Sequence, residues 1–320
     1  MIQIAEAWLV HGQVPKGFYR SSGFRTALVG AAWGADIPAA LGVGPVLLRR
    51  AWPWGGYFAN EQESFMTRKI QRYGWVPDLP DQRDHLYAVP PGVMAILPSR
   101  ADLRPACPPV LDQGELGSCT ANAIANAHFY DQLKQKDTNP FPPSRLFIYY
   151  NERVMEGSVR SDAGAQIRDG IKTLVKQGAC PESLWPYVIA KFATKPPAPA
   201  FKEAEKHQAI LYRRLTQTLV QLKGCLAEGY PFVFGFSVYE SFESDAVAKT
   251  GKVPMPGHSE KNLGGHAVLA VGYDDTQQVF IVMNSWSDGW GDKGYFYMPY
   301  AYLTDANLAA DFWTVRAVEG

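Results

Sequence analysis

Apolar residues in the middle of the chain recur at helical spacing. Residues 120–133 are rich in alanine and place Ile124, Ala127 and Leu133 on one face, which predicts a helix that begins just after Ser118, its N-cap. A second helix is predicted over Ile167–Lys176, with Gly178 as its C-cap. A third follows in the run LVQLKGCLAEGY. The first half of the globular region is therefore expected to be helical.

Aromatic and β-branched residues dominate the last third of the chain. They form runs separated by glycine, aspartate and proline, which predicts strands joined by tight turns: residues 231–239, 266–275, 278–286 and 294–303. The proline-rich stretch at residues 195–200 separates this part from the helical one and suggests two lobes. A helical first half and a strand-rich second half predict an α+β fold.

The N-terminal third has a different character. Residues 1–60 contain only two acidic side chains, and the apolar stretch at 27–48 is interrupted by Asp36 and two prolines, so it does not fit a transmembrane helix. We expect residues 1–60 to be a poorly structured extension; a signal or anchor is the alternative. Residues 61–98 are polar and rich in proline, which favours a segment that drapes over a surface. The globular domain is expected over residues 99–320.

Charge and cysteine content narrow the function. The chain has 31 basic and 31 acidic residues, so the charge excess on which nucleic-acid binders rely is absent. Its four cysteines include no CxxC pair, which argues against a zinc or redox-pair site, and no metal or cofactor is predicted. The cysteines do not decide the compartment. The sequence leans toward an exported protein, although it contains no convincing signal peptide.

Cys119 is either a buried structural cysteine or a nucleophile. It falls in the first turn of the predicted helix, where unpaired backbone N–H groups and the helix dipole lower the pKa of a thiol. A nucleophilic thiol also needs an imidazole. Of six histidines, His266 fits best, because two glycines precede it at the start of a buried strand and let another part of the chain approach closely. His128 is nine residues along the same helix and is expected in the core.

Residues that could support a thiol–imidazole pair of Cys119 and His266 are also present. Asn284 ends a strand that can pair with the strand of His266, so its amide can hold the imidazole in one tautomer. Trp286 and Trp290 can roof that contact and exclude water, although each can equally be a plain core residue. The backbone N–H of Cys119 and the side-chain amide of Gln113 can serve as donors to an oxyanion.

With these residues assembled, the chain resembles the papain-like cysteine proteases, in a bacterial form. The resemblance rests on Gln113 six residues before Cys119, on GGHAVLAVGY and on NSWSDGWGDKGYFYM, and it extends from about residue 99 to the C-terminus. It implies a two-lobe fold with the active site in a cleft, between a helical lobe at about 113–200 and an antiparallel, barrel-like β lobe at about 201–320.

The resemblance also implies roles. Cys119 would be the nucleophile, His266 the acid and base, Asn284 the orienting residue and Gln113 the oxyanion donor of a cysteine endopeptidase. Binding of an extended polypeptide would fall to Ala163, Gly164 and Ala165 by backbone pairing, and to Gly235, Gly265 and Trp286. The protein is expected to be a monomer that does not insert stably into a membrane.

Some features depart from the family. Leu116 stands where the family has a cysteine, so its usual disulfide is missing, and Thr120 replaces a tryptophan. Residues 61–98 are a candidate pro-segment, predicted to lie over or beside the cleft and to make the protein a zymogen. Two alternatives stay open: an acyl transferase, which would favour an aspartate in place of Asn284, and a catalytically impaired protein that binds or inhibits.

Overall fold

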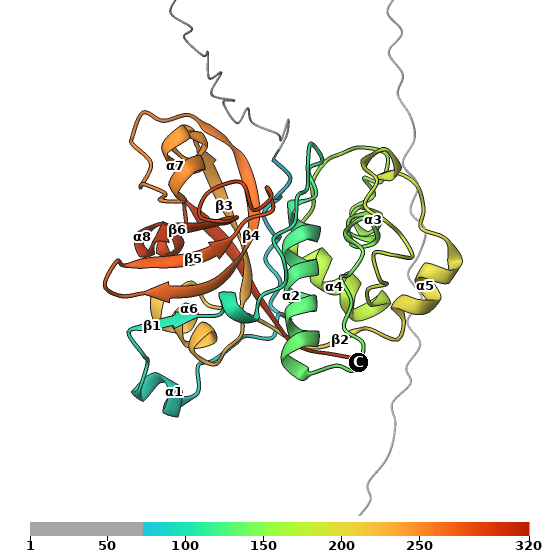
Figure 1. The fold of residues 1–320 in the computed structure, drawn as a ribbon, viewed down its shortest axis with the longest axis horizontal. Helices are drawn as coiled ribbons and strands as arrows, with labels where there is room; N and C mark the ends of the chain where they lie inside the picture. The colour runs from blue at the N-terminus through green and yellow to red at the C-terminus, as the bar shows by residue number, and fades with distance from the viewer. Residues whose placement is uncertain (1–72, 320) are drawn as a thin grey trace, which may run out of the picture. The chain divides into compact units, whose positions relative to one another are not determined.

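A helical half and a sheet half meet along one long helix in the computed structural model, which describes residues 73–319. The helix is α2 (Cys119–Gln135), and it stands between the sheet on one side and the other helices of the first half on the other (Figure 1). Those helices are α3 (Arg145–Met155), α4 (Ile167–Gln177) and the short α5 (Ala198–Ala204). This arrangement confirms the α+β prediction.

All the strands pair antiparallel, in the order β2-β7-β3-β4-β5-β6, with β1 added beside β4. The strands are β1 (Arg100–Asp102), β2 (Ala209–Arg214), β3 (Phe232–Tyr239), β4 (Asn262–Asp274), β5 (Val279–Met283), β6 (Tyr295–Pro299) and β7 (Ala309–Val318). Most of their buried side chains are aromatic or β-branched, which suits a sheet with buried faces. β1 lies well before residue 113 in the chain and still belongs to the sheet.

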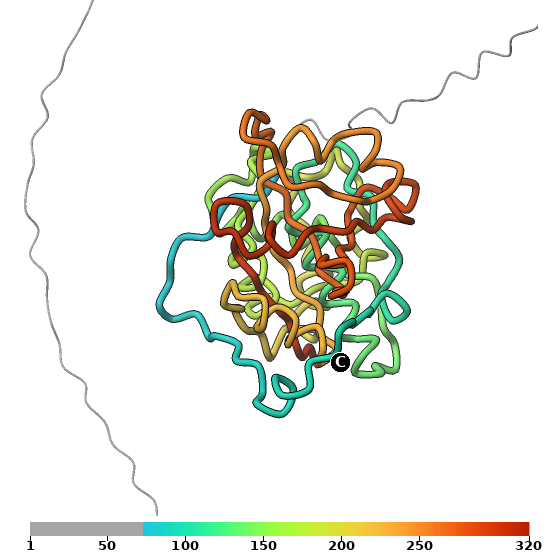
Figure 2. Tube along the Cα trace, turned by 90° about the vertical axis from the view of Figure 1, so that its left-hand side faces the viewer, coloured from blue at the N-terminus to red at the C-terminus, as the bar shows by residue number. Residues whose placement is uncertain are grey.

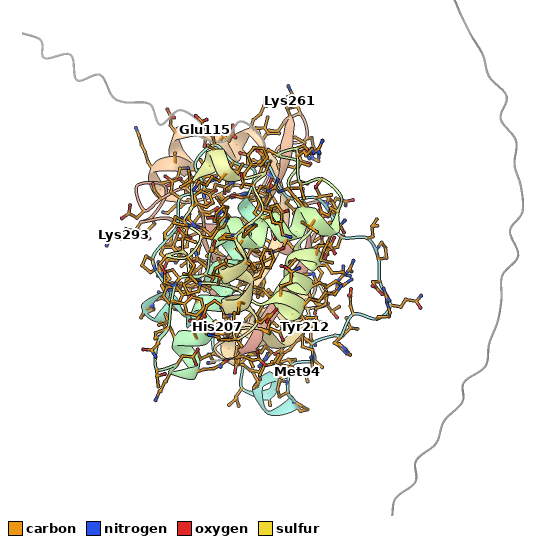
Figure 3. All side chains as sticks on the ribbon, turned by 90° about the vertical axis from the view of Figure 1, so that its right-hand side faces the viewer. Met94, Glu115, His207, Tyr212, Lys261 and Lys293 are labelled. Carbon is orange, nitrogen blue, oxygen red and sulfur yellow. The ribbon has the colours of Figure 1, made fainter. Side chains whose placement is uncertain are left out.

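Short helices decorate the sheet half: α1 (Pro91–Ala95), α6 (Leu219–Ala227), α7 (Asp245–Thr250) and α8 (Tyr300–Thr304). The strand predicted over residues 294–303 is therefore wrong in its second part. Pro299 ends β6, and the chain turns into α8 directly after it. Proline fits this change, because it lacks the N–H that a ladder needs and suits a helix start. Met94 of α1 projects into solvent at the edge of the molecule (Figure 3).

The buried helix α2 carries most of the contact between the halves. Its apolar face contains Cys119 and Ile124, both fully buried, in a core shared with α3, α4 and β4. A second core, rich in phenylalanine, fills the other face of the sheet. Leu133 was predicted to face inward but is exposed, and the Ser118 hydroxyl does not cap the helix: it accepts from the Asn122 amide instead.

Residues 73–89 form an extended strap that passes between α2 and the sheet (Figure 1) and then runs down one side of the molecule (Figure 2). Isolated bridges hold the strap at both ends, Trp75 to Ala165 and Leu86 to Arg214. We call residues 73–89 the strap from here on. Residues 1–60 and the first part of the candidate pro-segment lie outside the described residues. No helix within residues 73–319 is long and apolar enough to cross a bilayer.

Candidate active site

Cys119 is the first residue of α2, and its thiol is completely buried. The loop before it is held by Asp162, whose carboxylate accepts from the Gly117 N–H at 3.0 and 3.1 Å. The thiol contacts the backbone N–H of Ala267, the residue that follows His266 in β4. The first residue of α2 therefore meets β4 at the position next to His266, although Cys119 and His266 are 147 residues apart in the chain.

The His266 imidazole is fixed by Asn284. Its Nε2 lies 2.9 Å from Asn284 Oδ1, and because an amide oxygen only accepts, the hydrogen belongs to Nε2. His266 Nδ1 is left without a hydrogen-bond partner among residues 73–319, although it is fully buried. That nitrogen is thus the free acceptor of the ring. Asn284 comes directly after β5 and is held by the Ser285 N–H on the same oxygen, at 2.9 Å.

Aromatic rings enclose the histidine. Trp286 stacks on the imidazole with ring centroids 5.0 Å apart, while Tyr73 and Phe236 meet it edge-on at 5.8 and 5.7 Å. Trp290, the other tryptophan predicted to cover the contact, packs on Trp286 with ring centroids 5.1 Å apart and not on the imidazole. One tryptophan and a strap tyrosine therefore keep water off the His266–Asn284 contact.

Gln113 lies in the loop that leads to Cys119, and its side chain is also buried. Its side-chain N–H₂ donates to the Leu116 carbonyl at 2.9 Å, and its oxygen accepts from the Ser285 hydroxyl at 2.5 Å. The Gln113 backbone N–H donates to the Ser285 carbonyl at 2.9 Å. These three contacts fix the amide and leave it one further N–H to donate.

Burial favours the uncharged form of both candidate catalytic groups, the Cys119 thiol and the His266 imidazole. It raises the pKa of the Cys119 thiol to about 12, against the smaller lowering effect of the Ala267 and Gly74 backbone N–H groups. Burial likewise lowers the pKa of His266 to about 4, although the Asn284 hydrogen bond works in the opposite direction. The arrangement is a neutral thiol and a neutral imidazole at neutral pH.

The strap is what buries the site. The Ala165 N–H donates to the Gly74 carbonyl at 2.8 Å, and the Val76 N–H donates to the Ala165 carbonyl at 3.0 Å. On the opposite wall, the Trp75 N–H donates to the Gly265 carbonyl at 2.9 Å. Trp75 pairs parallel with Ala165. The strap thus adds a short strand between the two halves, with the Gly74 N–H against the thiol.

The candidate peptide-binding residues surround Trp75. A side-chain atom added at Gly235 or Gly265 would collide with the indole ring, and one added at Gly164 would collide with Gly74. Gly164 also has a φ of 76°, which suits glycine. Of the six residues in this group, five therefore lie at the strap or over His266. Ala163 has no such contact with the strap.

The two positions that depart from the family pattern have structural partners. Leu116 is buried in the core of the helical half. The Thr120 hydroxyl donates to the buried Glu152 carboxyl at 2.9 Å. All four cysteines are free, so no disulfide replaces the missing one. No cluster of three metal-binding side chains occurs in the part of the chain that the structure describes.

Sequence reasoning did not single out three residues that hold the site. Ser285 fixes Gln113, Asp162 fixes the loop before Cys119, and the Tyr187 hydroxyl donates to the Gln113 carbonyl at 2.9 Å. Ser285 lies next to Asn284 in the quoted NSW run, so that signal was available. Asp162 directly precedes the Ala163–Ala165 stretch, but neither its carboxylate nor the Tyr187 hydroxyl has a sequence signal that predicts its contact with the loop before Cys119.

Comparison with known proteins matches this geometry to a family. Residues 97–311 match the profile described as "Papain family cysteine protease". The chain belongs to the papain family. A peptidase C1-like protein of Acanthamoeba polyphaga mimivirus is 44% identical over 277 residues, which cover 79% of this chain and 89% of that protein.

Solved structures agree with this assignment. Xylellain, a cysteine protease from Xylella fastidiosa, is 44% identical and superposes with a TM-score of 0.74, over 79% of this chain and 98% of that one. A procathepsin B from Trypanosoma congolense is 17% identical over 71% and 80% of the two chains, with a TM-score of 0.59, and supports the fold alone. The protein is therefore a papain-family cysteine peptidase with the two-lobe fold of that family.

Proposed function

We propose that the protein is an endopeptidase that uses Cys119 as nucleophile and His266 as acid and base, and that it is made as a zymogen. The observation that carries the proposal is the single partner of the imidazole. Asn284 engages Nε2 and leaves Nδ1 as the only free acceptor of the ring, on the strand whose next residue touches the thiol. A structural cysteine would have no need of a histidine held in one tautomer.

The proton movements follow from that tautomer. His266 Nδ1 takes the thiol proton, and Cys119 Sγ attacks the carbonyl carbon of the scissile bond. The resulting oxyanion accepts from the Cys119 backbone N–H and the Gln113 side-chain N–H. His266 Nδ1–H then protonates the leaving amine, and the C–N bond breaks to leave an acyl-enzyme. Water adds to the acyl carbon and gives a proton to Nδ1. The thioester bond then breaks, the acid product leaves, and the proton returns to sulfur.

Asn284 stabilises the charged state of the imidazole in this cycle. Its oxygen accepts from Nε2–H whether or not Nδ1 is protonated, and the bond is stronger when the ring is cationic. Trp286 shields that bond from water. The two residues therefore favour the thiolate–imidazolium pair once the site is open to solvent and substrate.

The strap supports the zymogen part of the proposal. It makes the backbone hydrogen bonds to Ala165 and Gly265 that an extended substrate would make, and its Trp75 indole occupies the space against Gly235 and Gly265. A polypeptide substrate cannot bind while these groups are occupied. Removal of the strap would also rehydrate Cys119 and His266, which moves the pKa of the thiol down and that of the imidazole up.

Turnover of a fluorogenic peptide panel tests the proposal. We expect cleavage by the full chain after its strap has been cut or displaced, and no cleavage by the Cys119→Ala variant treated in the same way. A thiol-directed epoxide should label Cys119 in the active preparation. Equal turnover by both proteins would refute Cys119 as nucleophile. No turnover and no labelling would instead favour a catalytically impaired protein that binds or inhibits.

A further inference from the structure

In the proposed mechanism two N–H groups bind the oxyanion, and one tyrosine hydroxyl joins the segments that carry them. The Tyr187 hydroxyl donates to the Gln113 carbonyl at 2.9 Å and lies 2.6 Å from the Ser118 hydroxyl. Gln113 bears the side-chain donor, and Ser118 directly precedes Cys119, which bears the backbone donor. The Tyr187 hydroxyl therefore bridges the two ends of the loop before α2, residues 112–118, at the point where the donors are placed.

The hydrogen bonds around this hydroxyl run in one direction. A carbonyl oxygen only accepts, so the single hydroxyl proton of Tyr187 belongs to the bond with Gln113. The Ser118 hydroxyl must then donate to the Tyr187 oxygen, while its own oxygen accepts from the Asn122 amide at 3.0 Å. The donors are thus aligned from α2 to Gln113, and aligned hydrogen bonds strengthen one another.

Arg145, the first residue of α3, holds the tyrosine and the loop together. The Cζ of its guanidinium lies 3.8 Å from the centroid of the Tyr187 ring, and its Nη1 donates to the Asp112 carbonyl at 2.9 Å. The Glu182 carboxylate accepts two further hydrogen bonds from the guanidinium, at 2.6 and 2.9 Å. A planar fork can make the carboxylate pair, the ring contact and the carbonyl bond at once, whereas an ammonium cannot.

These contacts are separate from those that set the charge of the thiol. Within residues 73–319, neither the Tyr187 hydroxyl nor the Arg145 guanidinium makes a hydrogen bond to the Cys119 thiol or to the His266 imidazole. Formation of the thiolate depends on the thiol and the imidazole, whereas binding of the oxyanion depends on where two N–H groups stand. A change at Tyr187 should therefore affect the second and not the first.

We propose that Tyr187 and Arg145 are positioning residues that set the separation between the Gln113 side-chain N–H and the Cys119 backbone N–H. This rests on the proposed peptidase function and adds to it a pair that promotes formation of the oxyanion and not of the thiolate. Both residues act through the loop at 112–118 and touch neither the substrate nor the reacting atoms.

The test compares peptide hydrolysis with alkylation of the same thiol, in the full chain after strap displacement. Hydrolysis passes through an oxyanion, whereas alkylation by iodoacetamide requires only the thiolate. Tyr187→Phe keeps the ring beside Arg145 and removes the hydroxyl. Because loss of a whole oxyanion donor lowers kcat about 100-fold or more, we expect a displaced donor to lower it about tenfold, with KM unchanged. The rate of Cys119 alkylation and its pH profile should stay within about twofold of wild type.

A double-mutant cycle shows whether Tyr187 acts through the glutamine. In the Gln113→Ala background the side-chain donor is already gone, so Tyr187→Phe should lower kcat by less than about threefold. An independent structural effect would instead repeat the full tenfold loss. Arg145→Lys keeps the charge and loses the planar fork, and it should also lower kcat about tenfold while alkylation is retained.

Tyr273→Phe is the matched control. The Tyr273 hydroxyl also donates to a backbone carbonyl, that of Pro98 at 2.6 Å, but it lies beside β1 and near the opposite end of β4 from His266. Loss of this hydroxyl should change kcat by less than about twofold.

The outcomes separate this inference from the proposed function. An unchanged kcat in Tyr187→Phe, an equal loss of hydrolysis and alkylation, or a full tenfold loss in the Gln113→Ala background overturns the positioning role while leaving the peptidase intact. Absence of all turnover by the wild type, together with no epoxide labelling of Cys119, overturns the peptidase function and this inference with it.

Discussion

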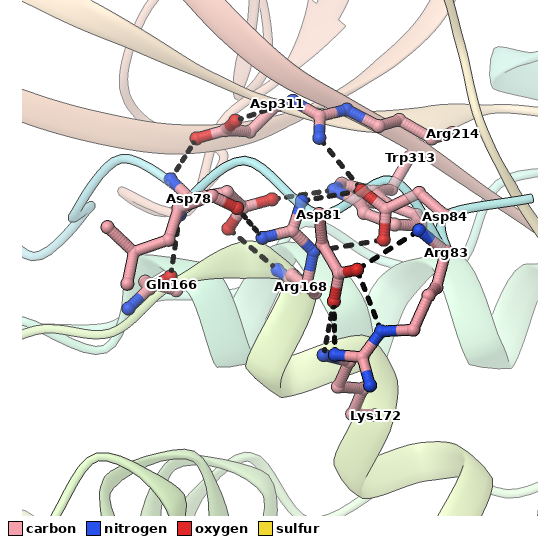
Figure 4. Close-up of polar contacts among 11 residues, drawn as sticks. Asp78, Asp81, Arg83, Asp84, Gln166, Arg168, Lys172, Arg214, Asp311 and Trp313 are labelled. Atoms are coloured by element: carbon pink, nitrogen blue, oxygen red, sulfur yellow. Dashed lines mark hydrogen bonds and ion pairs between the residues drawn. The ribbon is translucent and has the colours of Figure 1, made fainter. Parts of the chain in front are cut away.

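The strap is held at two regions by different interactions, by burial of uncharged groups at one and by ion pairs at the other. At Cys119 and His266 it excludes water and leaves both groups uncharged. Some residues later it is held by charge: Asp84 pairs with Arg168 at 2.5 Å and with Arg214 at 2.8 Å, with the carboxylate almost fully buried (Figure 4). In the proposed zymogen, the Cys119 thiol is silenced by desolvation, while the strap is attached by ion pairs that a mutation can remove without changing a residue of the candidate site.

Of the variants considered, Asp84→Ala should increase strap release the most. The change removes the Asp84 carboxylate from Arg168 and Arg214 while the strap is bound, and leaves Arg214 with only its longer ion pair to Asp311 at 3.4 Å. Breaking a buried pair from one side costs about 3 kcal/mol or more, which corresponds to roughly 100-fold in strap release. We expect carbamidomethylation of Cys119 in the full chain to accelerate accordingly, as followed by mass spectrometry of the Cys119 peptide.

Asp81→Ala is the matched control for that variant. Asp81 is also on the strap and pairs with the exposed Arg83 and with Lys172. Ion pairs at the surface contribute little, so labelling should change by less than about twofold. Equal acceleration by the two variants would mean that strap attachment does not depend on the buried pair.

Trp75→Ala should have the next largest effect on strap release. It changes the strap at the candidate active site and not at the Asp84 ion pairs. The indole is partly buried between Gly235 and Gly265, and its loss removes roughly 2 kcal/mol of packing, or about 30-fold in strap release. Peptide turnover by the untreated full chain should rise by that factor. Unchanged turnover would show that the ring does not hold the strap in place.

The pH dependence should be smaller and of defined sign. Burial, then the Asp311 charge, raises the pKa of Asp78 to about 6, while the Arg168 N–H, the Trp313 indole N–H and the Arg168 charge oppose the shift. The protonated form is thus favoured in the bound strap. Its stabilising contribution is complete below about pH 4 and is lost as the pH rises through 6, so strap release should be up to about tenfold easier at pH 7.5 than at pH 5.

Asp78→Asn isolates this contribution, because the amide cannot ionise. The ratio of Cys119 labelling in wild type to labelling in this variant should rise between pH 5 and pH 7.5, which removes the intrinsic pH dependence of the thiol reagent. A ratio that is flat, or that falls with pH, would exclude Asp78 as the titrating group.

Local patterns predicted much of this molecule. Helix α4 with its Gly178 cap, the strands β3 to β5 and the α+β class all follow from spacing and turn residues. The residues around Cys119 could be selected from the sequence because the candidate nucleophile, imidazole and amide occur in order in three separate motifs. Their roles stay predictions until the variants are measured.

Other features have no local signal. The strap reads as a polar, proline-rich loop, and its buried pairs depend on Arg168 and Arg214, both more than 80 residues away in the chain. The bulge at Asp311 is created by a register shift against β3, which composition does not encode. Ser118 was a reasonable cap by type, but the Asn122 amide competes for its oxygen.

The proposal that the strap silences Cys119 by burying it is tested most directly by carbamidomethylation of Cys119. The rate is measured as a function of pH in the full chain with the strap bound and in the Asp84→Ala chain. We expect almost no labelling of the wild type at neutral pH, with a rise only in alkali. Labelling of the variant should extend to acidic pH, because the thiolate–imidazolium pair forms there. His266→Ala in the opened chain should lose the acidic limb. Identical profiles for the wild type and the Asp84→Ala variant would contradict it.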